Sequence, residues 1–260
     1  MPLSASIYVP TEVPIEVIVD GKKTPRTLAI SLPDNFDSTL YITPQKTPLG
    51  QGLNAQISYN PAGSTYATSN GDYNTENIAN DGTLINAKEL YNYGSITNAG
   101  NLENNGIISS YFGEVVNIGL LSGSGSLYGD IINSGTISPG NSAGGYLIDG
   151  NLYQKEGSTK EIELSGTYHG DGDRTATEYD WIEITGDLEL AGGLDVSLID
   201  GFKLSAGNSF VITKVDGDLS GQYNDLDEGD SVGRFKTEHG GTLDLFITYQ
   251  GGDGNDIELY

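Results

Sequence analysis

A short motif recurs between residues 78 and 139, and it limits the possible folds of this chain more than any other feature. Five segments share the frame apolar-x-Asn-x-Gly-x-apolar: IANDGTLIN (78–86), LYNYGSITN (90–98), LENNGIISS (102–110), VVNIGLLSG (115–123) and IINSGTISP (131–139). Their first apolar residues are spaced by twelve, twelve, thirteen and sixteen positions. Asn-x-Gly supplies a turn in each unit, because Gly and sometimes Asn tolerate positive φ.

A short period with one turn in each unit predicts a β-solenoid, in which the apolar flanks stack from one unit to the next. The alternative is a meander of hairpins joined by Asn-Gly-like turns. In a solenoid the regular Asn residues are expected to form an internal amide ladder. Such a ladder is structural and not catalytic.

The sequence divides into three regions. Residues 1–68 contain most of the chain's nine prolines and the β-branched stretch VPIEVIVDGKKTPRTLAISL, so we expect extended segments and a hairpin over about residues 14–32. Residues 69–149 carry the solenoid repeats. Residues 150–260 contain short alternating stretches between Gly-containing turns, a pattern typical of a β-sandwich or jelly roll.

The last region has eight expected strands, at residues 160–164, 179–184, 187–190, 194–199, 209–215, 234–236, 242–249 and 256–260. Its expected core is apolar and comprises Trp181, Ile184, Leu194, Val196, Leu198, Phe210, Ile212, Leu245, Ile247 and Leu259. No stretch of the chain predicts a helix. The predicted fold class is therefore all-β: a short β-solenoid, similar to a parallel β-helix, then a C-terminal β-sandwich or jelly-roll-like domain, preceded by an extended N-terminal β segment.

Charge and composition exclude several classes of partner. The chain has 36 acidic and 12 basic residues, with a formal net charge of −24. Nucleic acids and anionic membranes require clustered Lys and Arg, so we expect neither as a partner. No apolar run reaches transmembrane length, so membrane insertion is not expected either. The chain has no cysteine, which excludes disulfides and thiolate metal sites.

The later blocks of the sequence resemble a module of bacterial surface proteins. GTISPGNSAGGYLIDGNLYQ, STKEIELSG, TEYDWIEITGDLELAGGLDVSLIDGF, AGNSFVITKVDGDLSGQY and TLDLFITYQGGDGNDIEL are similar, in this order, to the C-terminal part of autotransporter-type passenger proteins and PEP-CTERM-type exoproteins. The resemblance covers about residues 135–260. It implies solenoid coils that lead into a terminal sandwich, and a secreted, non-enzymatic surface or matrix protein of bacteria. The first ten residues, MPLSASIYVP, lack the regions of a signal peptide, so export would use another route or a signal outside this chain.

GGDGNDIEL (251–259) matches one copy of the calcium-binding nonapeptide G-G-x-G-x-D-x-U-x. One copy supplies only part of a Ca²⁺ coordination shell, because such sites use several stacked turns. The candidate ligands are Asp253, Asn255 and Asp256, and the alternative is a Gly-rich turn into the last strand. We expect no cofactor other than Ca²⁺ at this loop. Two other acidic loops offer oxygen ligands, with Asp171 and Asp173 in one and Asp225, Asp227, Glu228 and Asp230 in the other.

The sequence shows no catalytic constellation. Its two histidines, His169 and His239, lie in Gly-flanked loops, and neither a G-x-S-x-G nor an H-E-x-x-H motif occurs. With so many acidic residues, a carboxylate pair of the glycosidase type carries no information. We therefore expect no enzymatic activity. A strip of tyrosines along the repeats is a candidate for stacking on a cell-surface polysaccharide, although Tyr is also a common strand residue: Tyr91, Tyr93, Tyr111, Tyr128, Tyr146 and Tyr153.

The N-terminal segment favours self-assembly. SASIYVPTEVPIEVIV (4–19) is β-prone and belongs to neither later domain, and the ends of a solenoid expose strand edges that pair readily. The candidate donor strand consists of Ile7, Val9, Val13, Ile15, Val17 and Val19. Addition of this strand to the next subunit is head-to-tail and gives a fibre, whereas the alternative is that it folds back on its own chain.

The leading hypothesis is therefore an extracellular structural subunit that forms a homopolymer in a surface fibre or matrix. The alternative is a monomeric adhesion module that binds carbohydrate, calcium or both.

Overall fold

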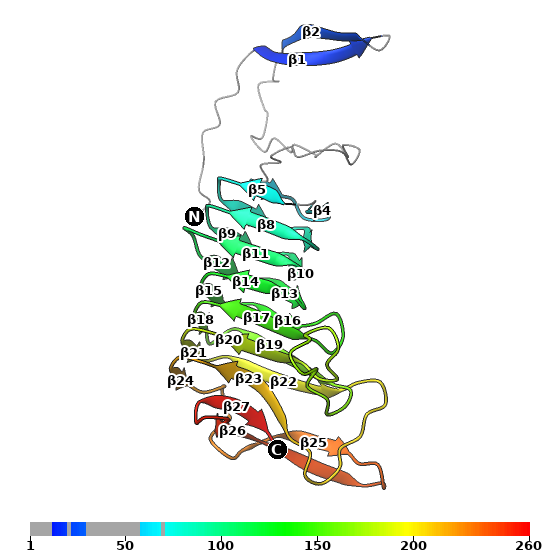
Figure 1. The fold of residues 1–260 in the computed structure, drawn as a ribbon, viewed down its shortest axis with the longest axis vertical. Helices are drawn as coiled ribbons and strands as arrows, with labels where there is room; N and C mark the ends of the chain where they lie inside the picture. The colour runs from blue at the N-terminus through cyan, green and yellow to red at the C-terminus, as the bar shows by residue number, and fades with distance from the viewer. Residues whose placement is uncertain (1–11, 20–21, 30–57, 69–70) are drawn as a thin grey trace. The chain divides into compact units, whose positions relative to one another are not determined.

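The computed structural model describes residues 12–19, 22–29, 58–68 and 71–260 (Figure 1). The chain forms two compact units, Met1–Pro48 and Leu49–Tyr260. In the first unit β1 (Glu12–Val19) and β2 (Lys22–Ala29) pair antiparallel, from Glu12 opposite Ala29 to Val19 opposite Lys22. The hairpin expected over about residues 14–32 is therefore confirmed.

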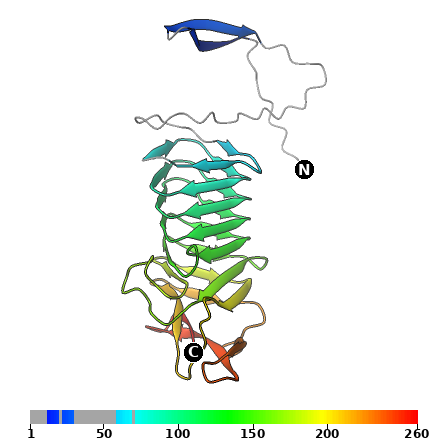
Figure 2. The ribbon, with the colours of Figure 1, turned by 90° about the vertical axis from the view of Figure 1, so that its right-hand side faces the viewer.

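The second unit is a three-sided parallel β-solenoid, seen from two directions in Figures 1 and 2. Three consecutive strands form one coil, and each strand of a coil belongs to a different sheet. The eight-stranded sheet contains β3 (Tyr59–Asn60), β6 (Ile78–Asn80), β9 (Ile96–Asn98), β12 (Val115–Asn117), β15 (Ile131–Asn133), β18 (Leu152–Gln154), β21 (Leu188–Leu190) and β24 (Leu219–Gly221).

The seven-stranded sheet contains β4 (Thr65–Ala67), β7 (Thr83–Asn86), β10 (Asn101–Asn104), β13 (Leu120–Gly123), β16 (Thr136–Pro139), β19 (Thr159–Leu164) and β22 (Gly193–Leu198). The ten-stranded sheet contains β5 (Asp72–Asn74), β8 (Glu89–Asn92), β11 (Ile107–Ser110), β14 (Ser126–Tyr128), β17 (Gly145–Asp149), β20 (Trp181–Ile184), β23 (Phe210–Val215), β27 (Asp256–Leu259), β26 (Thr242–Gly251) and β25 (Ser231–Lys236). No helix occurs among the described residues, so the all-β solenoid class is confirmed.

The structural repeat is longer than the spacing of the sequence motif. Asn80 and Asn98 are neighbours on adjacent coils and lie 18 residues apart in the chain. A step of twelve residues instead leads to a strand of another sheet. Ile78 lies in β6 of the eight-stranded sheet, Leu90 in β8 of the ten-stranded sheet and Leu102 in β10 of the seven-stranded sheet. The motif marks strands with an inward apolar residue and an inward Asn, and three such strands complete one coil.

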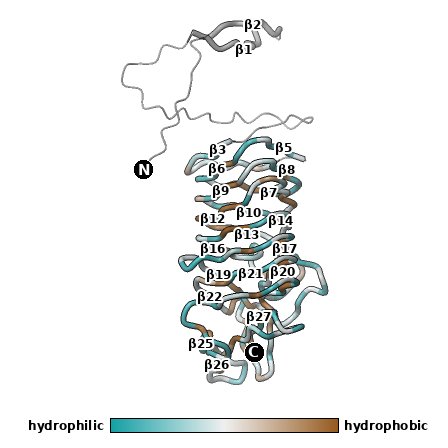
Figure 3. The backbone as a smooth tube through the Cα atoms, turned by 90° about the vertical axis from the view of Figure 1, so that its left-hand side faces the viewer, coloured by the Kyte–Doolittle hydropathy of each residue, from teal (hydrophilic) through white to brown (hydrophobic). Residues whose placement is uncertain are grey.

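The core consists of columns of aliphatic side chains, one column on the inner side of each sheet. In the eight-stranded sheet the column contains Ile78, Ile96, Val115, Ile131, Leu152 and Leu188, all at most 2% exposed. Figure 3 shows hydrophobic segments at corresponding places of successive coils. Each coil thus covers its apolar face with the neighbouring coils, as a solenoid requires.

Buried amide ladders run along the inside of the corners where two sheets meet. In the longest ladder the Asn60 Nδ2 donates to Asn80 Oδ1 at 2.7 Å, and the same bond repeats through Asn98, Asn117 and Asn133 at 2.6 to 2.7 Å. Each of the four donor Nδ2 groups, from Asn60 to Asn117, also donates its second hydrogen to a backbone carbonyl, at 2.8 to 2.9 Å. Shorter ladders join Asn86 to Asn104 and Asn74 to Asn92. The expected internal ladder is confirmed, and it satisfies polar groups that the coils bury.

The region expected as a separate β-sandwich instead continues the solenoid. β17, β18 and β19 pair in parallel with β20, β21 and β22, and β20 and β21 pair in parallel with β23 and β24. Only β25, β26 and β27 are antiparallel, and they extend the ten-stranded sheet. The eight expected strands all occur, but their predicted packing was wrong, because a half-buried strand alternates in the same way in a sandwich and in a solenoid.

The expected boundaries at residues 68 and 149 do not mark changes of architecture. β3 and β4 already stack on β6 and β7, and β17, which ends at residue 149, stacks on β20. Seven of the ten expected core residues of the last region are buried. The other three, Leu194, Val196 and Leu198, are half-buried because β22 is the last strand of its sheet.

Candidate functional site

The candidate donor residues divide between two parts of the chain. Val13, Ile15, Val17 and Val19 lie in β1, each opposite a residue of β2, whereas Ile7 and Val9 lie outside the described residues. Among the described strands, β1 and β2 pair with each other and with nothing else. A two-stranded sheet is marginally stable in water, so this hairpin is a strand pair that gains stability from a third strand.

The nonapeptide loop closes the last corner of the solenoid. The Asp256 Oδ1 accepts the Val215 N–H at 2.9 Å, and the Asn255 Nδ2 donates to the Gly217 carbonyl at 2.6 Å, while Asp253 is exposed. Burial raises the pKa of Asp256, and the neighbouring Asp253 raises it further. Two of the three candidate ligands therefore hold the end of the chain against the preceding coil.

Calcium at this loop stays a prediction. Among the described residues no three or more His, Cys, Asp or Glu side chains are placed to hold a metal ion. The Asn255 Oδ1 is buried without a hydrogen-bond partner. In the other acidic loops the carboxylates bind their own loops: Asp173 accepts from Thr175 at 2.7 and 2.9 Å, and Asp230 accepts the Asp227 N–H at 2.8 Å.

The two histidines lie far apart in the chain, in unrelated surroundings. His169 stacks on Trp181 with ring centroids 4.5 Å apart, and burial lowers the pKa of the imidazole. Its loop, residues 165–180, lies on part of the outer face of the ten-stranded sheet: the Arg174 Nη2 donates to the Ser126 Oγ of β14 at 2.8 Å, and the Arg174 carbonyl accepts the Gly145 N–H of β17 at 2.8 Å. His239 is exposed in the turn after β25. His169 therefore has a packing role in this loop.

Lys160 interrupts the aliphatic column of the seven-stranded sheet, between Ile137 and Leu194. Its Nζ is fully buried and donates to the Ile212 carbonyl at 2.8 Å and to the Thr213 Oγ1. Burial lowers the pKa of Lys160 to about 7. The pairing of β23 with β27 shifts register at this point, so Lys160 binds a carbonyl where the parallel coils change to antiparallel strands.

Asp180 is a second buried ionisable group near the same strand. Its Oδ1 accepts the Gly144 N–H at 2.7 Å, and its Oδ2 accepts the Glu163 N–H at 2.8 Å. Burial raises the pKa of Asp180 to about 8. Neither Asp180 nor Lys160 was predicted from the sequence. The signal for Lys160 was present, because in TKEIEL (159–164) it shares the inward parity of Ile162 and Leu164.

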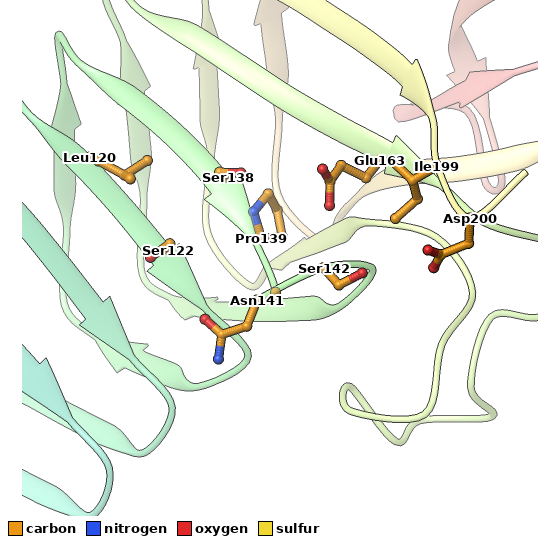
Figure 4. Close-up of a pocket in the computed structure, with 10 residues that line it drawn as sticks. Leu120, Ser122, Ser138, Pro139, Asn141, Ser142, Glu163, Ile199 and Asp200 are labelled. Atoms are coloured by element: carbon orange, nitrogen blue, oxygen red, sulfur yellow. The ribbon is translucent and has the colours of Figure 1, made fainter.

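A polar pocket of about 470 Å³ opens on the outer face of the seven-stranded sheet (Figure 4). Figure 4 shows Glu163 and Asp200 on one side of it and Leu120 and Ser122 on the other. The pocket is lined by hydroxyl, amide and carboxylate side chains together with Leu120, Pro139 and Ile199. It contains neither histidine, and no predicted site residue lies in it. It does not provide a nucleophile with an imidazole base.

The predicted tyrosine strip is partly present. Tyr146 is buried and accepts a hydrogen bond from the Asn104 Nδ2 at 2.9 Å, and Tyr153 lies on another sheet beneath the Lys155 ammonium. Tyr128 lies on β14, and the other three, Tyr91, Tyr93 and Tyr111, gather at one corner, where β8 and β11 turn into β9 and β12. We call this surface the aromatic ledge; it consists of Tyr91, Tyr93, Tyr111 and Phe112.

Ring contacts join the aromatic ledge into one surface. The Tyr93 ring lies 5.3 Å from the Tyr111 ring and 5.8 Å from the Phe112 ring, measured between centroids. The Tyr91 and Tyr111 rings are 6.4 Å apart and within 9° of parallel. Phe112 was missed from the sequence because a single Phe in a turn carries no periodic signal.

No family model matches this chain, and no curated protein matches it. In the part of the chain that the structure describes, no helix is long and apolar enough to cross a membrane.

Proposed function

We propose that this chain is a non-enzymatic structural subunit of an extracellular bacterial fibre or matrix. In this proposal the β1–β2 hairpin of one copy adds to an open sheet edge of another copy. The observation that carries it is that the hairpin is a two-stranded sheet in a compact unit of its own. Such a hairpin needs a further strand or a packing face to be stable.

Charge supports an encounter between the hairpin and the solenoid. β2 reads KKTPRTLA and contains Lys22, Lys23 and Arg26 but no acidic residue. The whole chain has three times as many acidic as basic residues, 36 against 12. A basic strand in an otherwise acidic molecule is attracted to the solenoid of a second copy, and salt weakens that attraction.

β22 offers an edge for strand addition. The Gly193 N–H donates to the Ser158 carbonyl at 2.8 Å and the Ile199 N–H to the Leu164 carbonyl at 2.9 Å, so amides of this parity face β19. The amides between them, at positions such as Val196, face the opposite side. Among the described strands β22 pairs with β19 alone, and its outward Asp195 is exposed.

The proposal is tested with the full chain and a triple variant, Lys22→Glu, Lys23→Glu and Arg26→Glu. We expect the wild-type protein to form polymers that grow with concentration and dissociate in high salt, and the variant to stay monomeric. Light scattering after size exclusion and negative-stain microscopy measure this. Lys88→Glu is the control, because it reverses an exposed charge on the solenoid. If the triple variant polymerises like the wild type, strand addition by this hairpin is wrong.

The alternative proposal is an adhesion module that binds calcium at the last corner. The buried, unpartnered Asn255 Oδ1 beside Asp253 favours it. Binding stabilises the folded state by mass action, so Ca²⁺ is expected to raise the melting temperature of the wild type and not that of Asp253→Asn. Equal melting temperatures with Ca²⁺ and with a chelator rule out this alternative.

A further inference from the structure

The aromatic ledge exposes apolar surface where the rest of the solenoid buries it. Phe112 is 82% exposed and Tyr111 is 54% exposed, and Phe112 is the most exposed large hydrophobic residue in the described chain. Single exposed apolar residues are common on protein surfaces, but these two adjoin Tyr91 and Tyr93 in ring contact. This exposed aromatic surface is therefore a candidate binding surface.

The corner that carries the ledge is longer than the equivalent corner of the preceding coil. Three residues, 93–95, join β8 to β9, whereas four residues, 111–114, join β11 to β12. The spacing of the ladder residues shows the same one-residue insertion: Asn80 and Asn98 are 18 residues apart, whereas Asn98 and Asn117 are 19 apart. Tyr111 occupies the position of Tyr93 in the preceding coil, because the N–H groups of both donate to the equivalent carbonyls of Asn92 and Asn74. Gly113 stacks on Gly94, so the additional residue is Phe112, and the insertion places its ring beside that of Tyr111.

Aromatic rings recur along the solenoid axis next to this corner. Tyr91 is paired with Ser109, and Ser109 is paired with Tyr128, so all three share one outward column of the ten-stranded sheet. Two strand spacings separate Tyr91 from Tyr128, which is roughly 10 Å. Tyr111 contacts Tyr91 from the coil of Ser109. The rings thus form a strip. The separation of Tyr91 and Tyr128 along it, two strand spacings, is close to the length of one disaccharide in an extended glycan.

The surroundings select the chemistry of the partner. The Tyr91 hydroxyl donates to the Glu89 Oε2 at 2.9 Å, and Glu114 lies in the corner itself. Together with the net charge of −24, these carboxylates repel anionic polymers. A peptide cannot add here as a strand, because β8, β11 and β14 are each paired on both sides. Sugar rings present C–H faces to an aromatic ring and hydroxyls to phenol and carboxylate oxygens.

We propose that the aromatic ledge, together with Tyr128, binds a neutral polysaccharide whose chain runs along the solenoid axis. This site contains no residue of the hairpin or of β22, so it does not depend on self-assembly. A surface subunit with such a site attaches to neutral glycan, whether or not it polymerises.

The test uses the full chain and measures retention on insoluble cellulose and chitin and migration in native gels that contain dextran or mixed-linkage β-glucan. Alginate is the anionic probe. We expect the wild type to bind at least one neutral probe and not alginate. The double variant Tyr111→Ala/Phe112→Ala is expected to lose at least about ten-fold in affinity. Tyr168→Ala is the matched control, because Tyr168 is an exposed aromatic residue, 45% exposed, on another part of the surface.

Two outcomes overturn the proposal. The first is that the wild type binds none of the neutral probes. The second is that the double variant binds as tightly as the wild type. If that variant also changes the oligomeric state in light scattering, the ledge is a contact between copies. Circular dichroism and the melting temperature of the variant show that a loss of binding is not a loss of fold.

Discussion

The coils up to β15 and the coils after it use the same three sheets, yet different interactions hold them together. From Asn60 to Asn133 each coil adds one equivalent amide to a continuous ladder. The next position of that column is Gln154, which makes one hydrogen bond of 3.3 Å to the Ala191 carbonyl and leaves its Oε1 unpartnered. Beyond it, Lys160 and Asp180 make contacts that no other coil repeats.

From this difference we expect the two halves of the solenoid to respond differently to substitution. In the ladder coils a substitution affects the coils on both sides, because each inner amide accepts a hydrogen bond from the preceding coil and donates one to the following coil. In the later coils each contact is single, so its loss is local. Four tests examine this contrast, from the largest expected effect to the smallest.

Replacing a ladder amide is expected to have the largest effect. Asn98→Leu keeps the side-chain size but removes the donor to Asn117 Oδ1 and to the Leu120 carbonyl and the acceptor for Asn80. Each buried polar group left unpaired costs about 1–3 kcal/mol, so we expect a loss of at least about 3 kcal/mol in the free energy of unfolding.

Gln154→Leu is the matched comparison, because Gln154 occupies the same column. It removes an unpartnered oxygen, so the free energy of unfolding should stay the same or rise. Urea denaturation measures both variants. Equal losses in the two variants contradict the proposed contrast between the two sets of coils.

A glycine at a stacked corner is the second test. The Cβ of Gly119→Ala would lie 2.1 Å from the Gly100 carbonyl oxygen of the preceding coil. We expect a loss of about 2 kcal/mol from the backbone shift that this contact forces. Gly157→Ala is the control, since its Cβ meets nothing within 4 Å. If Gly119→Ala is as stable as Gly157→Ala, the neighbouring coils adjust to the added Cβ without a loss in the free energy of unfolding.

The third test uses the buried lysine. Folding lowers the pKa of Lys160 from 10.5 to about 7, so between these values the unfolded chain binds more protons and the free energy of unfolding rises with pH. Lys160→Met removes this rise. Between about pH 7 and 10 the slopes of the two proteins are expected to differ by up to about 1.4 kcal/mol per pH unit. Urea denaturation at each pH checks this, and parallel curves show that Lys160 keeps its ordinary pKa.

The smallest effect is expected at the last corner. Asp256→Ala leaves the buried Val215 N–H without its acceptor and is expected to lower the free energy of unfolding by about 1 kcal/mol. Asp256→Asn keeps an acceptor oxygen and removes a charge that burial disfavours, so at neutral pH it should be at least as stable as the wild type. Thermal unfolding ranks the three proteins. If the Ala and Asn variants lose equal stability, the Val215 hydrogen bond is not the cause.

The same contrast explains how far the sequence predicted the fold. In the ladder coils six inward Asn residues lie two positions after an apolar residue and two before a Gly, so the repeat and its ladder were visible: Asn80, Asn92, Asn98, Asn104, Asn117 and Asn133. The motif does not reveal which sheet a strand joins, so the three strands of one coil were read as separate units. In the later coils Gln154 and Lys160 replace the expected residue types, and the loop at residues 165–180 separates β19 from β20. The stacking was therefore read as a sandwich.

The candidate surfaces were predictable to a smaller degree. Tyr146 was expected on the surface strip, but it shares the inward parity of Ile148 and is buried with it. Phe112 was not expected, because its position depends on the length of one corner and not on a repeat. Parity within a strand is readable from sequence, whereas contacts between coils depend on how long each corner is.

The long ladder also gives the solenoid a direction. Every amide from Asn60 to Asn117 donates to the coil that follows it, and none of these bonds runs the other way. The amide dipoles therefore add along the axis, with their positive ends toward the C-terminal coils. Two such solenoids placed end to end keep their dipoles in line when they point the same way, whereas two placed side by side prefer to be antiparallel. The fibre proposed above would therefore be polar, with two chemically distinct ends.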